Sequence, residues 1–501
     1  MKKNIIKTIC FVCLLAILLG SIHAVFQFKY SDGIKQITQF YKEKENSIDV
    51  LLLGSSHSFL NIYPEILWRD FGYSSFNLSA SLQPMWSTYH YLVEALKTQT
   101  PKVIVLEGYR LLEQDDYASR GTIIKSLYGM KWSKNKLEAL KASTYRKGTL
   151  DNENDLFTSA ELEEFEQLPF EFMNYHSRYS ELNEQDFLPY YGDPSYEYYK
   201  GGMVGDSVYD EYEQPDIESY DKEPIPLSAK TEEYYRKILE LGQEKGIPVV
   251  TVIAPFYILN QEYRIFLAAE QIAKEYGQMF VNYNELYDAI GLDFSTDILD
   301  AGSHLNRCGA EKFTHKLGQM LQDNFDLTDH RGDSRYQSWE DGAQRYTRAY
   351  GTMNGLTEIE SGADYVNHLL AEGQYSFAVI LNGTDEGVSD EAAAQINAVF
   401  EAMDIPNETI CDGIWFFENG KLQWSNTDRE GFKKAHRFDR YHDVRFEYGI
   451  TAEDDESAGF FIRNDTDSVI ACENLLTIHA YDNFSCIHAD TYRCDADGVR
   501  K

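Results

Sequence analysis

Short apolar runs alternate with amphipathic stretches along the first two thirds of the chain. The first run, residues 48–53 (IDVLLL), stops abruptly at Gly54-Ser55-Ser56, which is typical of a buried parallel strand entering a turn. Similar runs predict strands at residues 75–77, 102–106, 247–253 and 279–282. The stretches between them predict helices at residues 33–45, 64–71, 85–96, 228–245 and 262–276. The alternation predicts an α/β fold class, with a three-layer, parallel-sheet domain over residues 48–327.

A long insertion interrupts this alternation at residues 119–226, which are rich in Tyr, Glu and Asp and contain few long apolar runs. An insertion of this length inside an α/β domain is more often a lid or a substrate-binding element than a linker. Its most regular part is residues 174–187, where His176 and Arg178 stand in an acidic neighbourhood. Two interpretations of these residues stay open: they face a substrate site, or they belong to a solvated surface helix.

The C-terminal third has a different pattern. A polar loop and one amphipathic run at 297–327 predict the last helix of the first domain, and the charged residues 328–349 predict a linker. Residues 350–501 predict a C-terminal α+β module, with helices at 357–370 and 390–403 and a hairpin around Asn419-Gly420. The other strands of the module are expected at residues 377–381, 444–448, 458–462 and 475–481. Its sequence contains no evident nucleophile–base pair.

The N-terminus carries a membrane signal. Three lysines at positions 2, 3 and 7 precede about 20 mainly apolar residues, which is enough to span a bilayer. Positive residues before such a run predict a cytoplasmic N-terminus and an exported remainder. We therefore expect residues 1–28 to be a single-pass cell-membrane anchor, residues 29–47 a membrane-proximal helix, and the rest extracellular. Ser21-Ile22-His23-Ala24 is an acceptable signal-peptidase site, so cleavage and secretion stay open.

Composition narrows the range of partners. The chain has 81 acidic and 46 basic residues, a formal charge of −35, which argues against binding of nucleic acid or anionic membranes by the folded part. Beyond the N-terminal run, no cysteine has the spacing of a metal site, and we expect no metal or cofactor. One or two disulfides in the C-terminal third stay open, with no pairing favoured. The cysteines beyond the N-terminal run are Cys308, Cys411, Cys472, Cys486 and Cys494, and the last four of these lie in the C-terminal third.

Candidate chemistry follows the first and last strands. Ser56 comes directly after the first strand, and His304, with Asp300 or Asp297 before it, comes after the last. Parallel strands end at one edge of the sheet, where ligands bind, so a nucleophile, a base and an orienting acid can meet there. His57 is disfavoured as the base, because the side chain next to Ser56 cannot easily turn back to it. Alone, Gly-Ser-Ser is also compatible with a plain turn and helix N-cap.

These residues carry a resemblance. Gly54-Ser55-Ser56, and Asp300 and His304 within Asp-x-x-x-His-Leu-Asn-x-x-Gly-Ala, resemble the SGNH/GDSL hydrolase superfamily over residues 48–327. Within it, the chain is most similar to exported, membrane-anchored members, the DltD-like proteins of teichoic acid D-alanylation and the proteins of alginate acetylation. The resemblance implies Ser56 as nucleophile, His304 as general base and Asp300 as orienting carboxylate. The family spacing is Asp-x-x-His, one residue shorter, so Asp297 stays an alternative.

The resemblance also points to weaker oxyanion or substrate positions. The second family block falls at residues 77–81, which lack its glycine, so the amides of Ser79 or Ala80 would serve beside Asn77. The third block is replaced by Glu107-Gly108-Tyr109.

The implied function is extracytoplasmic serine-dependent O-acyl transfer to a cell-wall or exopolysaccharide glycan, with a membrane-bound O-acyltransferase as possible partner. Two alternatives stay open: an esterase or polysaccharide deacetylase with the same triad, and a catalytically degenerate glycan-binding protein. The C-terminal module faintly resembles the interleukin-like EMT-inducer domain at residues 413–424 and 475–482. That resemblance implies glycan or protein binding, while a spacer role stays equally open.

Overall fold

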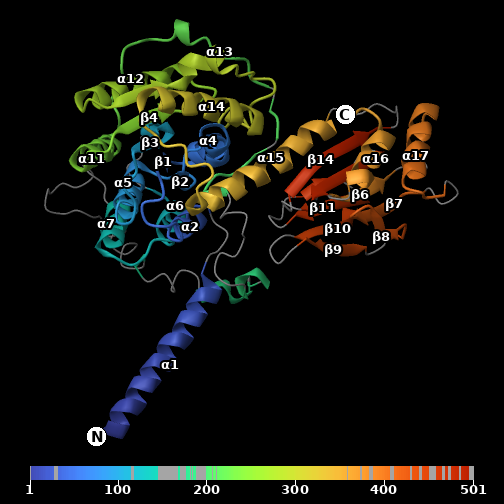
Figure 1. Cartoon of the computed structure of the whole chain (residues 1–501), viewed down its shortest axis with the longest axis horizontal. Coiled ribbons are helices and arrows are strands. Elements are labelled where there is room, and N and C mark those ends of the chain that lie inside the picture. Colours follow the sequence, from blue (N-terminus) through green and yellow to red (C-terminus); the bar gives the residue numbers. More distant parts are fainter. Residues whose placement is uncertain are drawn as a thin grey trace. The chain divides into compact units, whose positions relative to one another are not determined.

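The chain forms two compact units, Met1–Ala343 and Gln344–Lys501, which Figure 1 shows in the colours of the sequence. The division falls inside the segment that the sequence predicts as a linker. The computed structural model describes the following residues: 2–27, 32–113, 118–144, 168–169, 176–180, 182, 184–187, 199–205, 207–209, 211–357, 359–372, 375–382, 388–406, 411–428, 432–438, 443–450, 458–464, 469–471, 475–483 and 487–495.

The first unit is built on a five-stranded parallel sheet with the order β2-β1-β3-β4-β5. Its strands are β1 (Val50–Gly54), β2 (Ser75–Ser79), β3 (Val103–Glu107), β4 (Val249–Ile253) and β5 (Met279–Asn282). The predicted strands are present, and β2 is two residues longer than expected. The strand order changes direction between β1 and β3. In open α/β sheets, ligands bind at such a switch point, beyond the carboxyl ends of the strands.

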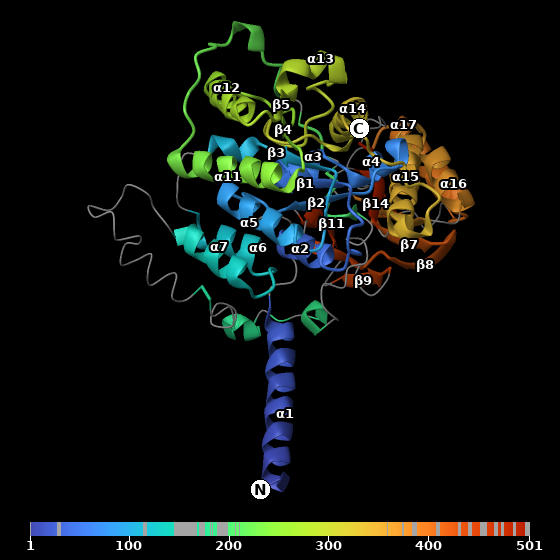
Figure 2. The same cartoon turned by 60° about the vertical axis from the view of Figure 1, so that its left-hand side comes forward.

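Helices flank this sheet and give the predicted α/β class (Figures 1 and 2). The helices α5 (Met85–Ala95) and α11 (Ala229–Lys245) pack against each other, while α14 (Arg307–Asn324) packs on α3 (Ser56–Asn61) and α4 (Pro64–Phe71). The first unit has further helical elements before and between these strands. They are α2 (Ile34–Phe40), η1 (Tyr109–Leu112), α12 (Asn260–Glu275), η5 (Tyr283–Leu286) and α13 (Tyr287–Ile290).

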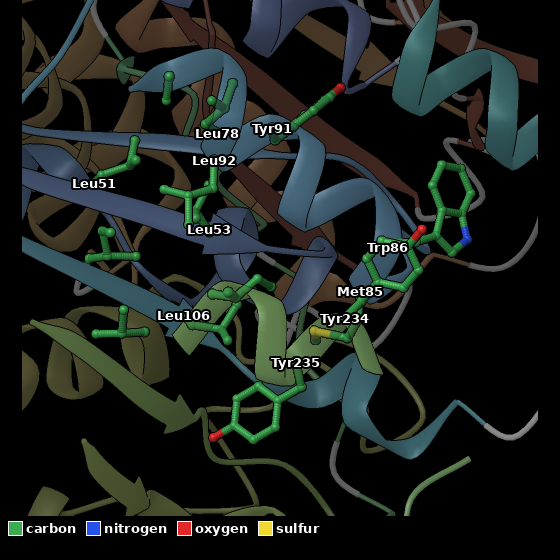
Figure 3. Packing of buried hydrophobic residues seen from close by; sticks show 14 of the residues in the cluster. Leu51, Leu53, Leu78, Met85, Trp86, Tyr91, Leu92, Leu106, Tyr234 and Tyr235 are labelled. Carbon is green, nitrogen blue, oxygen red and sulfur yellow. The ribbon is translucent and has the colours of Figure 1, made fainter. Parts of the chain in front are cut away.

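The core of this unit lies between the sheet and the helices α5 and α11. Figure 3 shows leucines of β1, β2 and β3 packed against residues of α5, with Tyr234 and Tyr235 of α11 beside them. Leu51, Leu53 and Leu106 are fully buried. Burying one such side chain is worth about 1.5–3 kcal/mol. These leucines therefore stabilise the sheet, whose first strand ends at the turn that carries Ser56.

The predicted insertion contains described helices at α6 (Arg120–Leu127), α7 (Lys134–Thr144), η2 (His176–Ser180), η3 (Glu184–Phe187) and η4 (Ile217–Ser219). The N-terminal helix α1 (Lys2–Phe26) contains a span, Ile6–Phe26, that is long and apolar enough to cross a membrane or to be a signal sequence.

The linker prediction is wrong for residues 328–340, which pack on the first unit. Trp339 is buried and donates its indole N–H to the Ser75 carbonyl at 2.8 Å. Trp68 donates its own indole N–H to Glu340 at 2.8 Å. The high charge of the segment hides these two aromatic contacts. The helical elements here are η6 (Ser334–Tyr336) and α15 (Gln337–Thr357).

The second unit is the predicted α+β module. Its helices are α16 (Gly362–Glu372) and α17 (Asp390–Ala402). One antiparallel sheet has the order β14-β13-β6-β7-β8 and another has the order β12-β11-β10-β9. The strands are β6 (Tyr375–Leu381), β7 (Gly413–Glu418), β8 (Lys421–Asn426), β9 (Lys433–Arg437), β10 (Asp443–Ile450), β11 (Ala458–Asn464), β12 (Val469–Ala471), β13 (Leu476–Asp482) and β14 (Ile487–Cys494).

The hairpin predicted at Asn419-Gly420 joins β7 and β8. Both residues have positive φ, 49° and 72°, which a two-residue hairpin turn of this hand requires. Cys308 and Cys411 are free thiols, Cys494 is buried, and Cys472 and Cys486 lie outside the described residues.

Candidate active site

Ser56 stands where β1 ends and α3 begins. The turn before it needs a glycine, because a Cβ atom on Gly54 would lie 2.9 Å from the Cβ atoms of both Glu107 and Ser58. The close approach lets the chain leave the sheet edge at once. Ser55 is buried and its hydroxyl has no hydrogen-bond partner, whereas Ser56 is partly exposed. The second serine is therefore the one that a substrate can reach.

The structure brings Ser56, His304 and Asp300 together. The Ser56 Oγ and the His304 Nε2 are 2.9 Å apart, and the His304 Nδ1 and the Asp300 Oδ2 are 2.7 Å apart. With the Nδ1 proton directed to the carboxylate, Nε2 is the basic nitrogen that faces the hydroxyl. The His304 side chain is 15% exposed and that of Asp300 is 44% exposed, so solvent reaches this end of the site.

The loop before His304 absorbs the extra residue between the acid and the base. The loop is closed by a bridge between Ile298 and Leu305. Asp300 Oδ1 accepts the backbone N–H groups of Ser303 and His304, both at 3.0 Å. Gly302 has a φ of +78°, which side chains rarely allow, and a Cβ there would lie 2.6 Å from Tyr257 Cβ.

Asp297, the alternative acid, has a different role. Its side chain is 1% exposed, pairs with Lys312 at 2.6 Å and accepts the backbone N–H of Asp293 at 2.8 Å. These contacts brace the loop behind the site and direct the carboxylate away from His304. The structure therefore favours Asp300 over Asp297 as the orienting acid.

Asp300 is held in its charged form. Partial burial opposes ionisation, but the hydrogen bonds from the His304 imidazole and backbone and from the Ser303 backbone outweigh it, so the pKa of Asp300 lies below its usual value. A carboxylate that stays ionised can orient the imidazole and stabilise the cation that forms when His304 accepts a proton.

His57 forms the floor beneath His304. It is 1% exposed, its ring stacks on Tyr109 with centroids 3.5 Å apart, and it lies 4.5 Å from the His304 ring. Its Nε2 lies 3.3 Å from Ser303 Oγ, and its Nδ1 has no partner. Burial, followed by the charges of His304 and Arg110, lowers the pKa of His57 well below its usual value. His57 makes no hydrogen bond to Ser56, in agreement with the sequence argument against it as the base.

Two rings of this floor, those of Tyr109 and Phe256, were not predicted as site residues from the sequence. Tyr109 follows β3, and Phe256 follows β4 and meets the His57 ring edge-on at 5.6 Å between centroids. The available signal was that both aromatic residues come within three positions of a strand end, at the same edge as Ser56.

The positions predicted to surround an oxyanion are largely occupied by structural contacts. Asn77 accepts the hydroxyls of Ser58 and Ser79 at 2.9 and 2.7 Å, and donates to the carbonyl oxygens of Ser58 and Ile62. It therefore fastens α3 to β2, and its predicted place beside an oxyanion or substrate stays a prediction. The side chains of Ser79 and Ala80 are fully buried. Because Gly54 pairs with Ser79, their backbone follows β2 beside the turn to Ser56.

Glu107 is also structural. It is fully buried and accepts the backbone N–H groups of Tyr109 at 3.1 Å and Ala254 at 3.4 Å. Burial raises its pKa to about 8, against the effect of these hydrogen bonds. The carboxyl ties the ends of β3 and β4 together, and its predicted contact with substrate or an oxyanion stays a prediction.

Arg178 is bonded to the end of α1. Its guanidinium donates to the carbonyls of Phe26 at 2.7 Å and Gln27 at 3.1 Å, and pairs with Asp186 at 3.1 Å. These contacts occupy the guanidinium at the end of α1, and the interpretation that Arg178 faces the substrate site stays a prediction. The backbone of His176 belongs to η2, while its side chain lies outside the described part of the chain, so that its role stays a prediction.

The arrangement defines a class of site, a serine hydroxyl bonded to an imidazole that a carboxylate orients, which can perform nucleophilic acyl chemistry. Among the described residues, no group of three or more His, Cys, Asp or Glu side chains could hold a metal ion. No protein-family model matches the chain, and no curated protein matches it either. The resemblance to the SGNH/GDSL superfamily therefore stays a hypothesis based on the motifs around Ser56 and His304.

Proposed function

We propose that the chain is an SGNH-type serine enzyme that transfers acyl groups to a glycan hydroxyl outside the cytoplasm. The observation that carries the proposal is the continuous path from Ser56 Oγ through His304 to Asp300, with distances of 2.9 and 2.7 Å. Each polar group has the partner that its role requires. The three residues come from two loops separated by more than 240 positions, so that local turn formation alone does not explain their meeting.

The proposed reaction has two steps. Ser56 Oγ attacks the carbonyl carbon of the acyl donor while His304 Nε2 takes the hydroxyl proton. His304 then returns that proton to the departing group, leaving an acyl ester on Ser56. In the second step the acceptor hydroxyl loses its proton to His304 and attacks this ester. The proton passes back to Ser56 Oγ, which restores the enzyme and releases the acylated acceptor.

Backbone amides would stabilise the oxyanion formed in each step. We assign this role to the amides of Ser79 or Ala80, because β2 pairs with β1 up to the turn that carries Ser56. A cavity of about 220 Å³ lies along the same edge, between residues that follow β2 and β3, and offers room for part of a substrate. Leu82, Met85, Trp86, Arg110 and Lys230 are among its lining residues.

Transfer rather than hydrolysis is our first choice because of the N-terminal helix. An apolar span with lysines before it would hold the enzyme at the outer face of the cell membrane, beside a membrane-bound O-acyltransferase that supplies acyl units. The C-terminal unit would then bind the glycan or a protein partner. An esterase or deacetylase is the second candidate, because the 44% exposure of Asp300 shows that water reaches the rim of the site.

The test uses the full chain in detergent, with p-nitrophenyl acetate as donor and oligosaccharides of cell-surface polysaccharides as acceptors. We expect nitrophenol release that depends on Ser56 and acetylated oligosaccharide that exceeds free acetate. Free acetate alone would assign the esterase. A wild-type protein that releases no nitrophenol and reacts with no serine-directed phosphonate would overturn the enzyme proposal in favour of a glycan-binding protein.

A further inference from the structure

Three exposed aromatic side chains come from segments that are attached to the end of the N-terminal helix. Outside α1, the described residues include three large aromatic side chains with high exposure: Trp132 at 56%, Tyr179 at 74% and Phe187 at 66%. They come from two parts of the insertion, the turn between α6 and α7 and the short helices η2 and η3. Leu137, on α7, is 37% exposed. A grouping of large apolar side chains at the surface marks an interaction site.

The α6–α7 turn is packed against the end of α1. Phe26, the last residue of α1, lies against a small apolar cluster formed by Ile34 of α2 and Tyr128, with Ile124 of α6 beside it. Trp132 follows Tyr128 by four residues, so its backbone lies at most about 14 Å away. Figure 2 shows α6 and α7 on the side of the first unit from which α1 leaves.

The second part of the insertion is fastened to the same point. Arg178 of η2 donates to the backbone carbonyls of Phe26 and Gln27 at the end of α1, and it pairs with the buried Asp186 of η3. The residues that directly follow Arg178 and Asp186 are the exposed tyrosine and phenylalanine. Tyr179 therefore directly follows the residue that binds the end of α1, and Phe187 directly follows the residue that pairs with it.

The length of the apolar span sets the depth of this point in a membrane. Ile6–Phe26 contains 21 residues, and at 1.5 Å per residue it spans about 31 Å, close to the roughly 30 Å of a hydrocarbon core. Phe26 therefore lies at the boundary with the headgroups when α1 crosses a bilayer. Tyr and Trp side chains are enriched at this depth because one part of the ring is apolar and another is polar.

We propose that Trp132, Tyr179 and Phe187 form a collar that sits in the headgroup region of the bilayer crossed by α1, with α1 retained as an anchor. The first unit then rests on the membrane instead of hanging from a flexible tether. This inference is independent of the chemistry at Ser56 and goes beyond it.

Local charge is compatible with this contact despite the overall charge of −35. Lys131 and Lys134, on either side of Trp132, are exposed, and the Nζ of Lys136 lies 4.9 Å from the Trp132 ring centroid, which holds the ring in place. The sequence argument against anionic membranes concerned the charge of the whole folded part. The collar meets lipid through aromatic rings and through lysines, whose charge suits phosphate headgroups.

The test uses the full chain in vesicles of phosphatidylcholine and phosphatidylglycerol, with the photoreactive residue p-benzoylphenylalanine placed at position 132, 179 or 187. Matched controls carry it at Val208 or Leu259, which are 58% and 52% exposed. We expect lipid adducts at the three collar positions at roughly ten times the control level, as for residues at a membrane interface. Thermal unfolding of each variant checks that the fold is intact.

Two results would overturn the proposal. One is lipid labelling at the collar no higher than at positions 208 and 259, including the case in which the collar labels only another protein. The other is an N-terminus that begins after Ala24 in protein isolated from membranes, because cleavage there removes the anchor. Loss of esterase activity would leave both readouts unchanged, so failure of the proposed function and failure of the collar are distinguishable.

Discussion

The rim and the floor of the candidate site use the same kinds of side chain in opposite ways. At the rim, His304 is partly exposed, faces Ser56 and has an ionised carboxylate as its partner. On the floor, His57 is buried between Tyr109 and His304, and burial keeps its ring neutral. Glu107, also on the floor, has a pKa of about 8. A titratable side chain near a nucleophile is thus a reactive group only where solvent and substrate reach it.

The difference also separates two kinds of support. Residues at the rim must accept and release protons. Each of them therefore has a charged or hydrogen-bonding partner, and the strength of that contact depends on ionisation. Floor residues supply shape, because a neutral ring under His304 limits the directions in which that imidazole can turn. The predictions below test this division, from the largest expected effect on activity to the smallest.

Removing the nucleophile should have the largest effect. Ser56→Ala should lower kcat for ester cleavage by roughly 10³-fold or more if the triad operates, with the fold unchanged. Ser55→Ala is the matched control, since the buried Ser55 hydroxyl has no partner, and it should retain activity close to that of the wild type. Equal turnover in the Ser56 variant and the wild type would remove Ser56 from the mechanism.

The two aspartates should separate cleanly. Asp300→Asn should lower kcat by roughly 10²- to 10⁴-fold, because the amide no longer stabilises the protonated imidazole. Asp297→Asn should instead lower the melting temperature, because it weakens the pair with Lys312, and should leave kcat per folded molecule nearly unchanged. Steady-state kinetics and thermal unfolding of both variants provide the comparison. The opposite ranking of kcat would assign the orienting role to Asp297.

The floor should show a smaller effect that depends on shape. His57→Ala removes the ring below His304 and should lower kcat roughly tenfold, since loss of position at a catalytic group costs rate. His57→Phe keeps a ring stacked on Tyr109 and should stay within about threefold of the wild type. Rates are counted per phosphonate-titrated site and KM is measured beside kcat. A Phe variant as slow as the Ala variant would show that the imidazole nitrogens matter, not the ring.

Substitution of Glu107 should have the smallest effect on activity. Its effect should appear in the free energy of unfolding instead. Its pKa of about 8 exceeds the ordinary 4.5, so the folded chain holds a proton that the unfolded chain releases. The stabilisation is complete below pH 4.5 and is lost as the pH rises through 8. Between pH 5 and 8, the free energy of unfolding measured in urea should therefore fall by about 1–3 kcal/mol less in Glu107→Gln than in the wild type.

Glu65 serves as the internal comparison for this prediction. Burial also raises its pKa to about 8, so it contributes a slope of the same sign. Glu65→Gln should also flatten the curve of unfolding free energy against pH, and the double variant should flatten it more than either single variant. Parallel stability curves for the wild type and Glu107→Gln would contradict the buried, protonated carboxyl.

The sequence predicts most of the first unit and the catalytic candidates for one reason. Buried parallel strands leave continuous apolar runs, and the polar residues that follow them must meet at one edge. Ser56 and His304 are candidates by this rule, and the motif resemblance gives them their roles. Asn77 and Glu107 obey the same rule, yet their partners include backbone groups that no sequence pattern specifies.

Other elements escape prediction for physical reasons that differ. The strand β9 (KKAHR) is an exposed edge strand that pairs only through β10, so it has no apolar alternation. Trp339 packs on the first unit from within a charged segment, and one aromatic residue gives no periodicity. Arg178 recognises the end of a helix more than 150 positions away, which depends on tertiary structure alone.

The most direct test of the central claim is covalent labelling by a serine-directed phosphonate, followed by mass spectrometry of the peptides. The wild-type chain should carry a single adduct on Ser56, and His304→Ala should abolish it, because the hydroxyl reacts only when the imidazole takes its proton. Ser55 and Ser58 serve as neighbouring controls in the same peptide. An unlabelled Ser56, or equal labelling in the His304 variant, would contradict the account.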